Sequence, residues 1–183
     1  AMAAGTLVEV KGKDGELIGR GIYNGTSQIS LRLLTQHRAQ ELDERFFRAA
    51  LERALAFRQD TLRLPEVTDA FRWVHGEADG LSGLIVDRYA DVCVIQPFYA
   101  GWSRQTLDWI VAGLQSLVPG SRSALRPELR SADREGVNYA AELSLYTGPE
   151  NVEVQEHGLR VNVDLRAGHK TGFFLDQREN RQR

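Results

Sequence analysis

The sequence has 183 residues, of which 42% are hydrophobic and 26% charged, and its formal net charge is −2. This composition is typical of a globular protein with one or two domains, and it excludes nucleic-acid binding through overall basicity, although a local basic patch stays compatible with it. The single cysteine excludes an internal disulfide framework, and no apolar run reaches membrane-spanning length, so we expect a cytoplasmic protein without a membrane partner.

The first segment of the chain predicts a small β-sheet. Three runs typical of strands, Leu7–Val10, Leu17–Tyr23 and Gln28–Leu34, are separated by the turn dipeptides Asp14-Gly15 and Asn24-Gly25. Three strands without a covering helix bury little area. We therefore expect this segment to be the remainder of a β-rich domain or a sheet that packs against a neighbour.

A polar linker over residues 35–40 precedes a predicted helix from Glu41 to Gln59. Apolar residues recur along this helix at three- and four-residue spacing, which indicates one face packed in a core. These residues are Leu42, Phe46, Ala50, Ala54 and Leu55.

The middle of the chain returns to strand patterns. Strands are predicted over Phe71–His75, Leu84–Tyr89 and Val92–Gln96, with weaker ones near Ser123–Leu125 and Ala140–Tyr146. Because a helix lies between the earlier strands and the later ones, the pattern indicates an α+β unit, whose order is summarised as strand–strand–helix–strand–strand.

The helix in this unit is predicted from about Ser103 to Val118, with Ser103 as its N-cap. Trp102 and Leu107 have the spacing of a hydrophobic staple. After the unit comes a predicted hairpin, Val152–Gln155 against Leu159–Leu165, whose second strand alternates apolar and polar residues.

The C-terminal segment combines features of a ligand-binding loop and a helix start. Gly168 and Gly172 bracket three polar residues, so the backbone there is free to adopt tight conformations. Asp176 and Glu179 have the spacing of a capping box, which predicts a helix. Fewer than two turns follow, too few for a helix to persist alone, so we expect the chain to be part of a larger protein.

Several motifs have a more ordinary structural interpretation. Gly19-Arg20-Gly21 lies between strands, so it does not match a dinucleotide-binding turn, and Gly168–Thr171 lacks the earlier glycine of a phosphate loop. Cys93 lies in an apolar strand and is interpreted as a buried structural thiol. The four histidines are far apart and form no zinc pattern, so we expect no metal.

Two acidic groups in the middle of the chain are also assigned to structure. Glu77 and Asp79 precede glycines and are expected to shape a turn, although paired carboxylates also suit acid–base chemistry. Asp87-Arg88-Tyr89 is expected to pair across its hairpin.

Three stretches in one order nevertheless resemble a known family. They are Gly19–Asn24 with Ser27–Arg32, then Gly76–Tyr89, then Glu156–Gly158 with Gly168–Arg178. Together they resemble the bacterial large-subunit ribosomal RNA cytosine-5 methyltransferases that carry an N-terminal PUA domain. The resemblance covers nearly the whole chain but only the N-terminal part of such a protein.

The resemblance implies an α+β protein in three parts. Residues 1–36 are expected to form a partial PUA-like RNA-binding domain, and residues 41–147 a central α+β domain. Residues 148–183 are expected to form a hairpin and a lead-in helix to a Rossmann-like methyltransferase domain that lies outside this sequence.

The resemblance also implies S-adenosylmethionine as cofactor and ribosomal RNA as partner. Most of the cofactor pocket and the cysteine nucleophile of the family lie outside this sequence, so the chain alone is expected to be inactive, with no catalytic residue of its own. The residues carried over are Phe174, Asp176, Gln177 and Arg178 for the cofactor, and Lys170 and Arg181 for RNA. Lys170 and Arg178 suit either the cofactor carboxylate or an RNA phosphate.

Alternatives remain open at this point. The chain is also compatible with a stand-alone RNA-binding or interaction module without catalysis, or with a methyltransferase for another substrate or atom. Faces that further domains would cover leave a dimer open, and the oligomeric state is not determined by the sequence.

Overall fold

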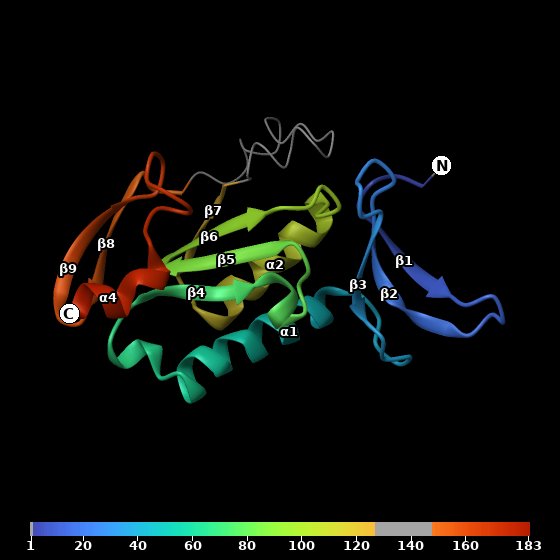
Figure 1. Ribbon diagram of the computed structural model, residues 1–183, viewed down its shortest axis with the longest axis horizontal. Coiled ribbons are helices and arrows are strands. Elements are labelled where there is room, and N and C mark those ends of the chain that lie inside the picture. Colours follow the sequence, from blue (N-terminus) through green and yellow to red (C-terminus); the bar gives the residue numbers. More distant parts are fainter. Residues whose placement is uncertain (1, 127–147) are drawn as a thin grey trace.

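The computed structural model describes residues 2–126 and 148–183, and within these ranges the strands form three sheets (Figure 1). The first sheet contains β1 (Thr6–Lys11), β2 (Leu17–Tyr23) and β3 (Leu31–Thr35) in sequential antiparallel order. All three strands were expected. β3 begins later than predicted because residues 24–30 form a turn in which the amide of Asn24 donates to the carbonyl of Ser30.

The expected helix in the next segment is α1 (Glu44–Ala56), which continues into a π-helical turn, Phe57–Thr61. It begins at Glu44 rather than Glu41 because the Asp43 carboxylate accepts a 2.9 Å hydrogen bond from the amide of Phe46, which is N-cap geometry. The predicted apolar face is buried as expected.

The central sheet has the order β4 (Ala70–His75), β5 (Leu84–Tyr89), β6 (Val92–Pro97) and β7 (Arg122–Leu125). The first three strands are antiparallel neighbours, and β7 pairs parallel to β6 after the crossover helix α2 (Arg104–Leu117). Ser103 caps α2 as predicted, with its hydroxyl accepting from the Thr106 amide. The strand predicted at Ala140–Tyr146 lies outside the described residues.

Side chains alternate along a strand, so the central sheet has two faces with different partners. Leu84 and Val86 of β5 and Cys93 and Ile95 of β6 face the core that contains α1 and α2. The two helices therefore cover one face of the sheet (Figure 1).

The opposite face is covered by the predicted hairpin, β8 (Asn151–Glu156) and β9 (Leu159–Asp164). Its turn places His157 at φ 49° and Gly158 at φ 80°, the two left-handed residues of a type I′ hairpin. A second apolar cluster joins the hairpin to the sheet, and it contains Ala70, Tyr89, Val92, Val94, Val152, Val154, Val163 and Leu165. The chain then passes through a 3₁₀ turn, Leu175–Gln177, into α4 (Arg178–Gln182).

The first sheet is attached to the central unit by side-chain contacts. The Tyr99 hydroxyl lies 3.2 Å from the Ile22 carbonyl and 3.3 Å from the Ser30 carbonyl, and the Arg32 guanidinium lies 4.7 Å from the Tyr99 ring centre. Arg32 also donates to Ser82 at 3.2 Å. Ile22 and Tyr99 are members of the same core as α1 and α2, so the two parts share one packed interior.

Candidate functional site

The candidate site begins on the face of β5 opposite the helices. Asp87 and Tyr89 share this face because they are two positions apart on one strand. The strand register places Arg72 of β4 opposite Asp87, and its guanidinium donates two hydrogen bonds of 2.8 and 3.0 Å to the carboxylate. Although Asp87 is 0% exposed, its charge is therefore paired and hydrogen-bonded.

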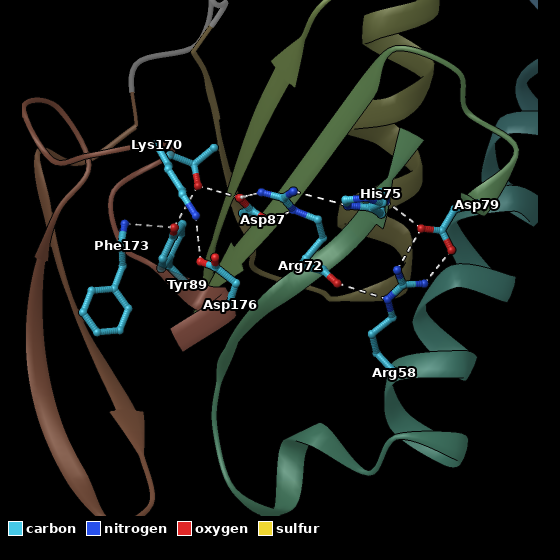
Figure 2. Close-up of polar contacts among 10 residues, drawn as sticks. Arg58, Arg72, His75, Asp79, Asp87, Tyr89, Lys170, Phe173 and Asp176 are labelled. Atoms are coloured by element: carbon cyan, nitrogen blue, oxygen red, sulfur yellow. Dashed lines mark hydrogen bonds and ion pairs between the residues drawn. The ribbon is translucent and has the colours of Figure 1, made fainter. Parts of the chain in front are cut away.

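The C-terminal loop is fixed to this pair by Thr171. Its buried hydroxyl donates a 2.5 Å hydrogen bond to Asp87, and the Tyr89 hydroxyl lies 2.8 Å from the same Thr171 oxygen. Because a carboxylate can only accept, the single proton of Thr171 goes to Asp87 and Tyr89 donates to Thr171. The Tyr89 oxygen in turn accepts from the amide of Phe173 at 3.2 Å (Figure 2).

The same environment changes the acidity of two of these groups. Burial, together with the nearby Asp87 charge, raises the pKa of Tyr89 to about 12. Burial acts to lower the pKa of Arg72, but its hydrogen bonds to Asp87 and the attraction of nearby negative charge, first that of Asp87, together outweigh burial and raise the pKa above its ordinary value. Both shifts favour the protonation states that hold the loop in place.

The backbone before the loop explains why glycine stands at Gly168. A side chain there would place its Cβ 2.2 Å from the carbonyl oxygen of Asp164 and 2.4 Å from that of Gly172. The Asp164 carboxylate accepts from the amides of Arg166 and Ala167, and these two bonds lower its pKa. The tight conformation expected between the two glycines is thus confirmed.

Lys170 and Asp176 face each other across the loop. The Lys170 ammonium lies 2.7 Å from the Asp176 carboxylate and 4.7 Å from the ring centre of Phe174. The hydrogen bond from Lys170 lowers the pKa of Asp176. The helix predicted after Asp176 forms as α4, but the capping-box assignment is wrong: Asp176 lies in the 3₁₀ turn before the helix, the N-cap position is Gln177, and no side chain caps the helix.

The remaining predicted residues lie in α4 and just before it. Arg181 donates two 2.8 Å hydrogen bonds to the buried carboxylate of Glu156 and stacks 4.1 Å from the ring centre of Phe173. The side-chain carbonyl of Gln177 accepts a 2.6 Å hydrogen bond from the side-chain amide of Asn180. The structure therefore brings the six predicted site residues into one segment, in which Arg181 and Lys170 already have acidic partners.

A cleft of about 430 Å³ lies between this segment and the central unit. Its lining residues come from the end of α1, the following turns, β4 and the C-terminal segment. They are Arg58, Leu62, Leu64, Phe71, Arg72, His75, Lys170, Phe173, Leu175, Asp176 and Arg178.

The sequence-based search did not single out Arg58 or Arg72. Arg58 is buried and donates to both carboxylate oxygens of Asp79, at 2.5 and 2.8 Å, and to the Arg72 carbonyl at 3.0 Å (Figure 2). The Arg72 guanidinium also lies 3.3 Å from Nδ1 of His75. In the sequence, Arg58 interrupts the apolar pattern at the end of the predicted helix. This interruption could have indicated a buried arginine that needs an acidic partner.

The structural interpretations of the other motifs are confirmed. Asp79 accepts from the amide of His75 as well as from Arg58, and Glu77 accepts from the Ser82 hydroxyl, so both carboxylates hold the turn. Cys93 is buried, and burial raises the pKa of its thiol to about 12.

Residues 2–126 and 148–183 contain neither a metal-binding cluster nor a membrane-spanning helix. Within those residues no three His, Cys, Asp or Glu side chains are grouped to hold a metal ion. Within the same ranges no helix combines the length and apolarity that crossing a membrane requires.

Comparison with family models gives one match in the first sheet. A model described as PUA-like domain matches residues 1–36, in agreement with the expectation for that segment.

Comparison with curated proteins gives relatives over nearly the whole chain. The chain is 37% identical over 177 residues to ribosomal RNA large subunit methyltransferase I of Alteromonas mediterranea, covering 97% of this chain and 44% of that protein. Proteins of the same name from Shewanella frigidimarina and Aliivibrio fischeri are 38% and 35% identical and are covered to 45%. The chain thus spans about half the length of these relatives, and their shared name agrees with the resemblance to large-subunit ribosomal RNA methyltransferases, while the cytosine-5 specificity stays a prediction.

Solved structures support the fold. A crystal structure of SMU.776, described as a candidate methyltransferase complexed with SAH, aligns with a TM-score of 0.74 at 20% identity over 98% of this chain and 44% of that one. A candidate SAM-dependent methyltransferase from Streptococcus mutans aligns with a TM-score of 0.72 at 21% identity, over 98% of this chain and 45% of its own.

Proposed function

We propose that this chain, a homologue of the ribosomal RNA large subunit methyltransferase I proteins, is a portion of a SAM-dependent methyltransferase that forms 5-methylcytosine in large-subunit ribosomal RNA. The observation that carries the proposal is the 35–38% identity to curated relatives over 97–98% of the chain. The PUA-like match at residues 1–36 supports an RNA substrate.

In this proposal the chain has three roles along its length. Residues 1–36 dock RNA, mainly through phosphate contacts, and residues 41–147 form the central unit. Residues 148–183 lead to the catalytic domain, which the present sequence does not include. The 183-residue chain alone is then inactive.

The C-terminal segment is proposed to form one wall of the cofactor site. Phe174 is 41% exposed and its ring is available to pack beside the cofactor, while the exposed Gln177 is placed to hydrogen-bond it. Asp176 and Arg178 complete the set proposed for the cofactor, and Lys170 and Arg181 the set proposed for RNA. The hydrogen bonds from Thr171 to the central sheet support this assignment because they fix the segment, and a preorganised wall binds a ligand at lower entropic cost.

The test uses the protein encoded by the complete open reading frame. With labelled S-adenosylmethionine and unmodified large-subunit ribosomal RNA, we expect transfer of label to RNA and recovery of 5-methylcytidine after nuclease digestion and mass spectrometry. Methylation at another atom or base would replace the product assignment. Absence of transfer to any RNA would favour a binding module without catalysis.

The site residues are tested in the same protein by substitution. Phe174→Ala and Gln177→Ala are expected to raise the KM for the cofactor, while Leu159→Ala at the hairpin tip, 67% exposed, serves as the control. Equal KM values for all three variants would contradict the proposed cofactor wall.

A further inference from the structure

The cleft beside β4 carries more positive than negative side chains. Four of its lining residues are arginine or lysine, a fifth is His75, and Asp176 is its carboxylate. The carboxylates that hold Arg58 and Arg72 do not line the cleft: Asp79 is largely buried behind the former and Asp87 is fully buried behind the latter. The cleft therefore presents the cationic side of two ion pairs.

These two ion pairs fix the guanidinium groups before any ligand arrives. Arg58 has four described acceptors, namely both oxygens of Asp79 and the carbonyls of Ala54 and Arg72. Arg72 is held by both oxygens of Asp87. Preorganised donors of this kind bind an anion with little loss of side-chain entropy.

Arg178 supplies the charge that is not compensated. Its side chain is half-buried at the cleft, and within the described residues it makes no hydrogen bond or ion pair. Of the two acidic residues beside it in sequence, Asp176 pairs with Lys170, and Glu179 forms no ion pair with Arg178 within the described residues. An anion in the cleft would give the Arg178 guanidinium an acceptor, which the described residues do not provide.

The rest of the lining is apolar. Leu62 is 48% exposed on one wall, and Phe173 and Leu175 are partly exposed on the other. A cleft with fixed cations at one side and apolar walls matches a nucleotide, which has an anionic phosphate and a flat base. Its volume of about 430 Å³ lies within the range of small-ligand sites.

We propose that this cleft binds one nucleotide of a single-stranded RNA segment, with the phosphate at Arg72 and Arg178 and the base against Leu62 and Phe173. The inference rests on the proposed function and deepens it, because it assigns an RNA contact to the central unit. It also assigns Arg178 to RNA rather than to the cofactor carboxylate. Phe174 and Gln177, proposed for the cofactor, do not line the cleft, whereas Asp176 does, so the two proposed ligands approach each other at Asp176.

The first experiment measures binding of a fluorescent, unstructured RNA of about 12 nucleotides to the 183-residue chain by anisotropy at several salt concentrations. Arg178→Ala is expected to weaken binding about 5-fold at low salt and to reduce the slope of log K against log salt by about 0.7, the contribution of one phosphate contact on a single strand. Leu62→Glu, which places a negative charge on the apolar wall, is expected to weaken binding about 10-fold.

Matched controls carry the same changes away from the cleft. Arg160→Ala removes an exposed arginine from β9, and Leu159→Glu adds a charge at the hairpin tip. Both control variants are expected to bind RNA with the affinity of the unaltered chain. All four variants are expected to keep the unfolding temperature of the unaltered chain. Crosslinking of 4-thiouridine RNA should label peptides that contain residues 58–64 and 170–178.

The inference is overturned if the chain does not bind the RNA, or if Arg178→Ala and Leu62→Glu bind it as tightly as the controls. It is also overturned if Arg178→Ala, in the protein of the complete reading frame, weakens binding of S-adenosylmethionine and leaves RNA affinity unchanged. None of these binding results would contradict the proposed methyl-transfer activity of the complete protein. The proposed function fails separately if the protein of the complete reading frame transfers no methyl group. The cleft proposal would still stand in that case if the cleft variants bind RNA more weakly than the controls.

Discussion

Thr171 donates a 2.5 Å hydrogen bond to Asp87, a residue 84 positions earlier in the chain. Both side chains are buried, and the bond joins the C-terminal loop to the middle strand of the antiparallel part of the central sheet. Replacement of Thr171 by valine keeps the shape of the side chain and removes the hydroxyl.

Thr171→Val is expected to lower the free energy of unfolding by about 1–2 kcal/mol, because Asp87 and Tyr89 each lose a buried partner. Urea denaturation measures the change, and amide hydrogen exchange at residues 171–173 should accelerate. Thr61→Val, at an exposed position, is the control and is expected to change little. Equal stability of the two variants would show that the buried hydroxyl does not hold the loop.

Tyr89 gives the protein an alkaline transition. Since its pKa is raised to about 12 in the folded state, above the ordinary value of 10, the unfolded state releases this proton first. The stability that Tyr89 contributes is fully present below pH 10 and is lost as the pH rises toward 12. Ultraviolet titration of phenolate formation should show a late-ionising component that disappears in Tyr89→Phe, and a titration unchanged by that substitution would contradict the assignment.

Lys170 is expected to control the acidity of Asp176. The pKa of that carboxyl is lowered from its ordinary value of 3.8, and the hydrogen bond from Lys170 is the largest cause. The ion pair is therefore fully present above pH 3.8 and is lost as the pH falls through the folded-state pKa. In Lys170→Ala the NMR-detected pKa of Asp176 should return toward 3.8. The pKa of Asp164, which is lowered by backbone amides instead, should not move.

Two Arg–Asp pairs of the same chemistry differ in burial and should differ in energy. Asp79→Ala leaves the buried Arg58 without its carboxylate and is expected to cost on the order of 3 kcal/mol in unfolding free energy. Asp91→Ala breaks a pair with Arg122 in which both side chains are about half exposed, and it should cost less than about 1 kcal/mol. Chemical denaturation compares the two, and similar costs would contradict the role assigned to burial.

Gly21 is required by the close approach of two strands. A Cβ at this position would lie 2.2 Å from the carbonyl oxygen of Arg32, a backbone atom of β3. Gly21→Ala is therefore expected to destabilise the protein by about 2 kcal/mol or more. Gly120→Ala, where φ is 81° but no atom lies within 4 Å, should cost about 1 kcal/mol, and thermal unfolding separates the two cases.

The secondary structure could be predicted because its signals are local. The strand alternation of residues 159–165 and the N-cap Ser103 each depend on neighbours within a few positions, and both were confirmed. The capping box predicted at Asp176 did not form, and a side chain outside the capping motif interacts with that carboxylate. Lys170 competes for the same carboxylate, and no local rule weighs a tertiary ion pair against a cap.

The site was predictable in part. The sequence indicated the Gly168–Arg178 segment, but the roles of its residues stay predictions. Its anchor to Asp87 and the approach of Arg58 to Asp79 depend on the β4–β5 register and on the packing of α1. Such contacts join residues that are distant in sequence, so periodicity cannot reveal them.

The contacts between Tyr99 and the carbonyls of Ile22 and Ser30 restrict rotation of the first sheet relative to the central unit. The connecting residues 36–40 are hydrogen-bonded to the first sheet as well, because Arg20 donates to the carbonyls of Arg38 and Gln40, so the connection and the packed interface together determine the orientation of that sheet. A substitution at Tyr99 would remove two of these contacts, while the bond from Arg32 to Ser82 would still join the two parts.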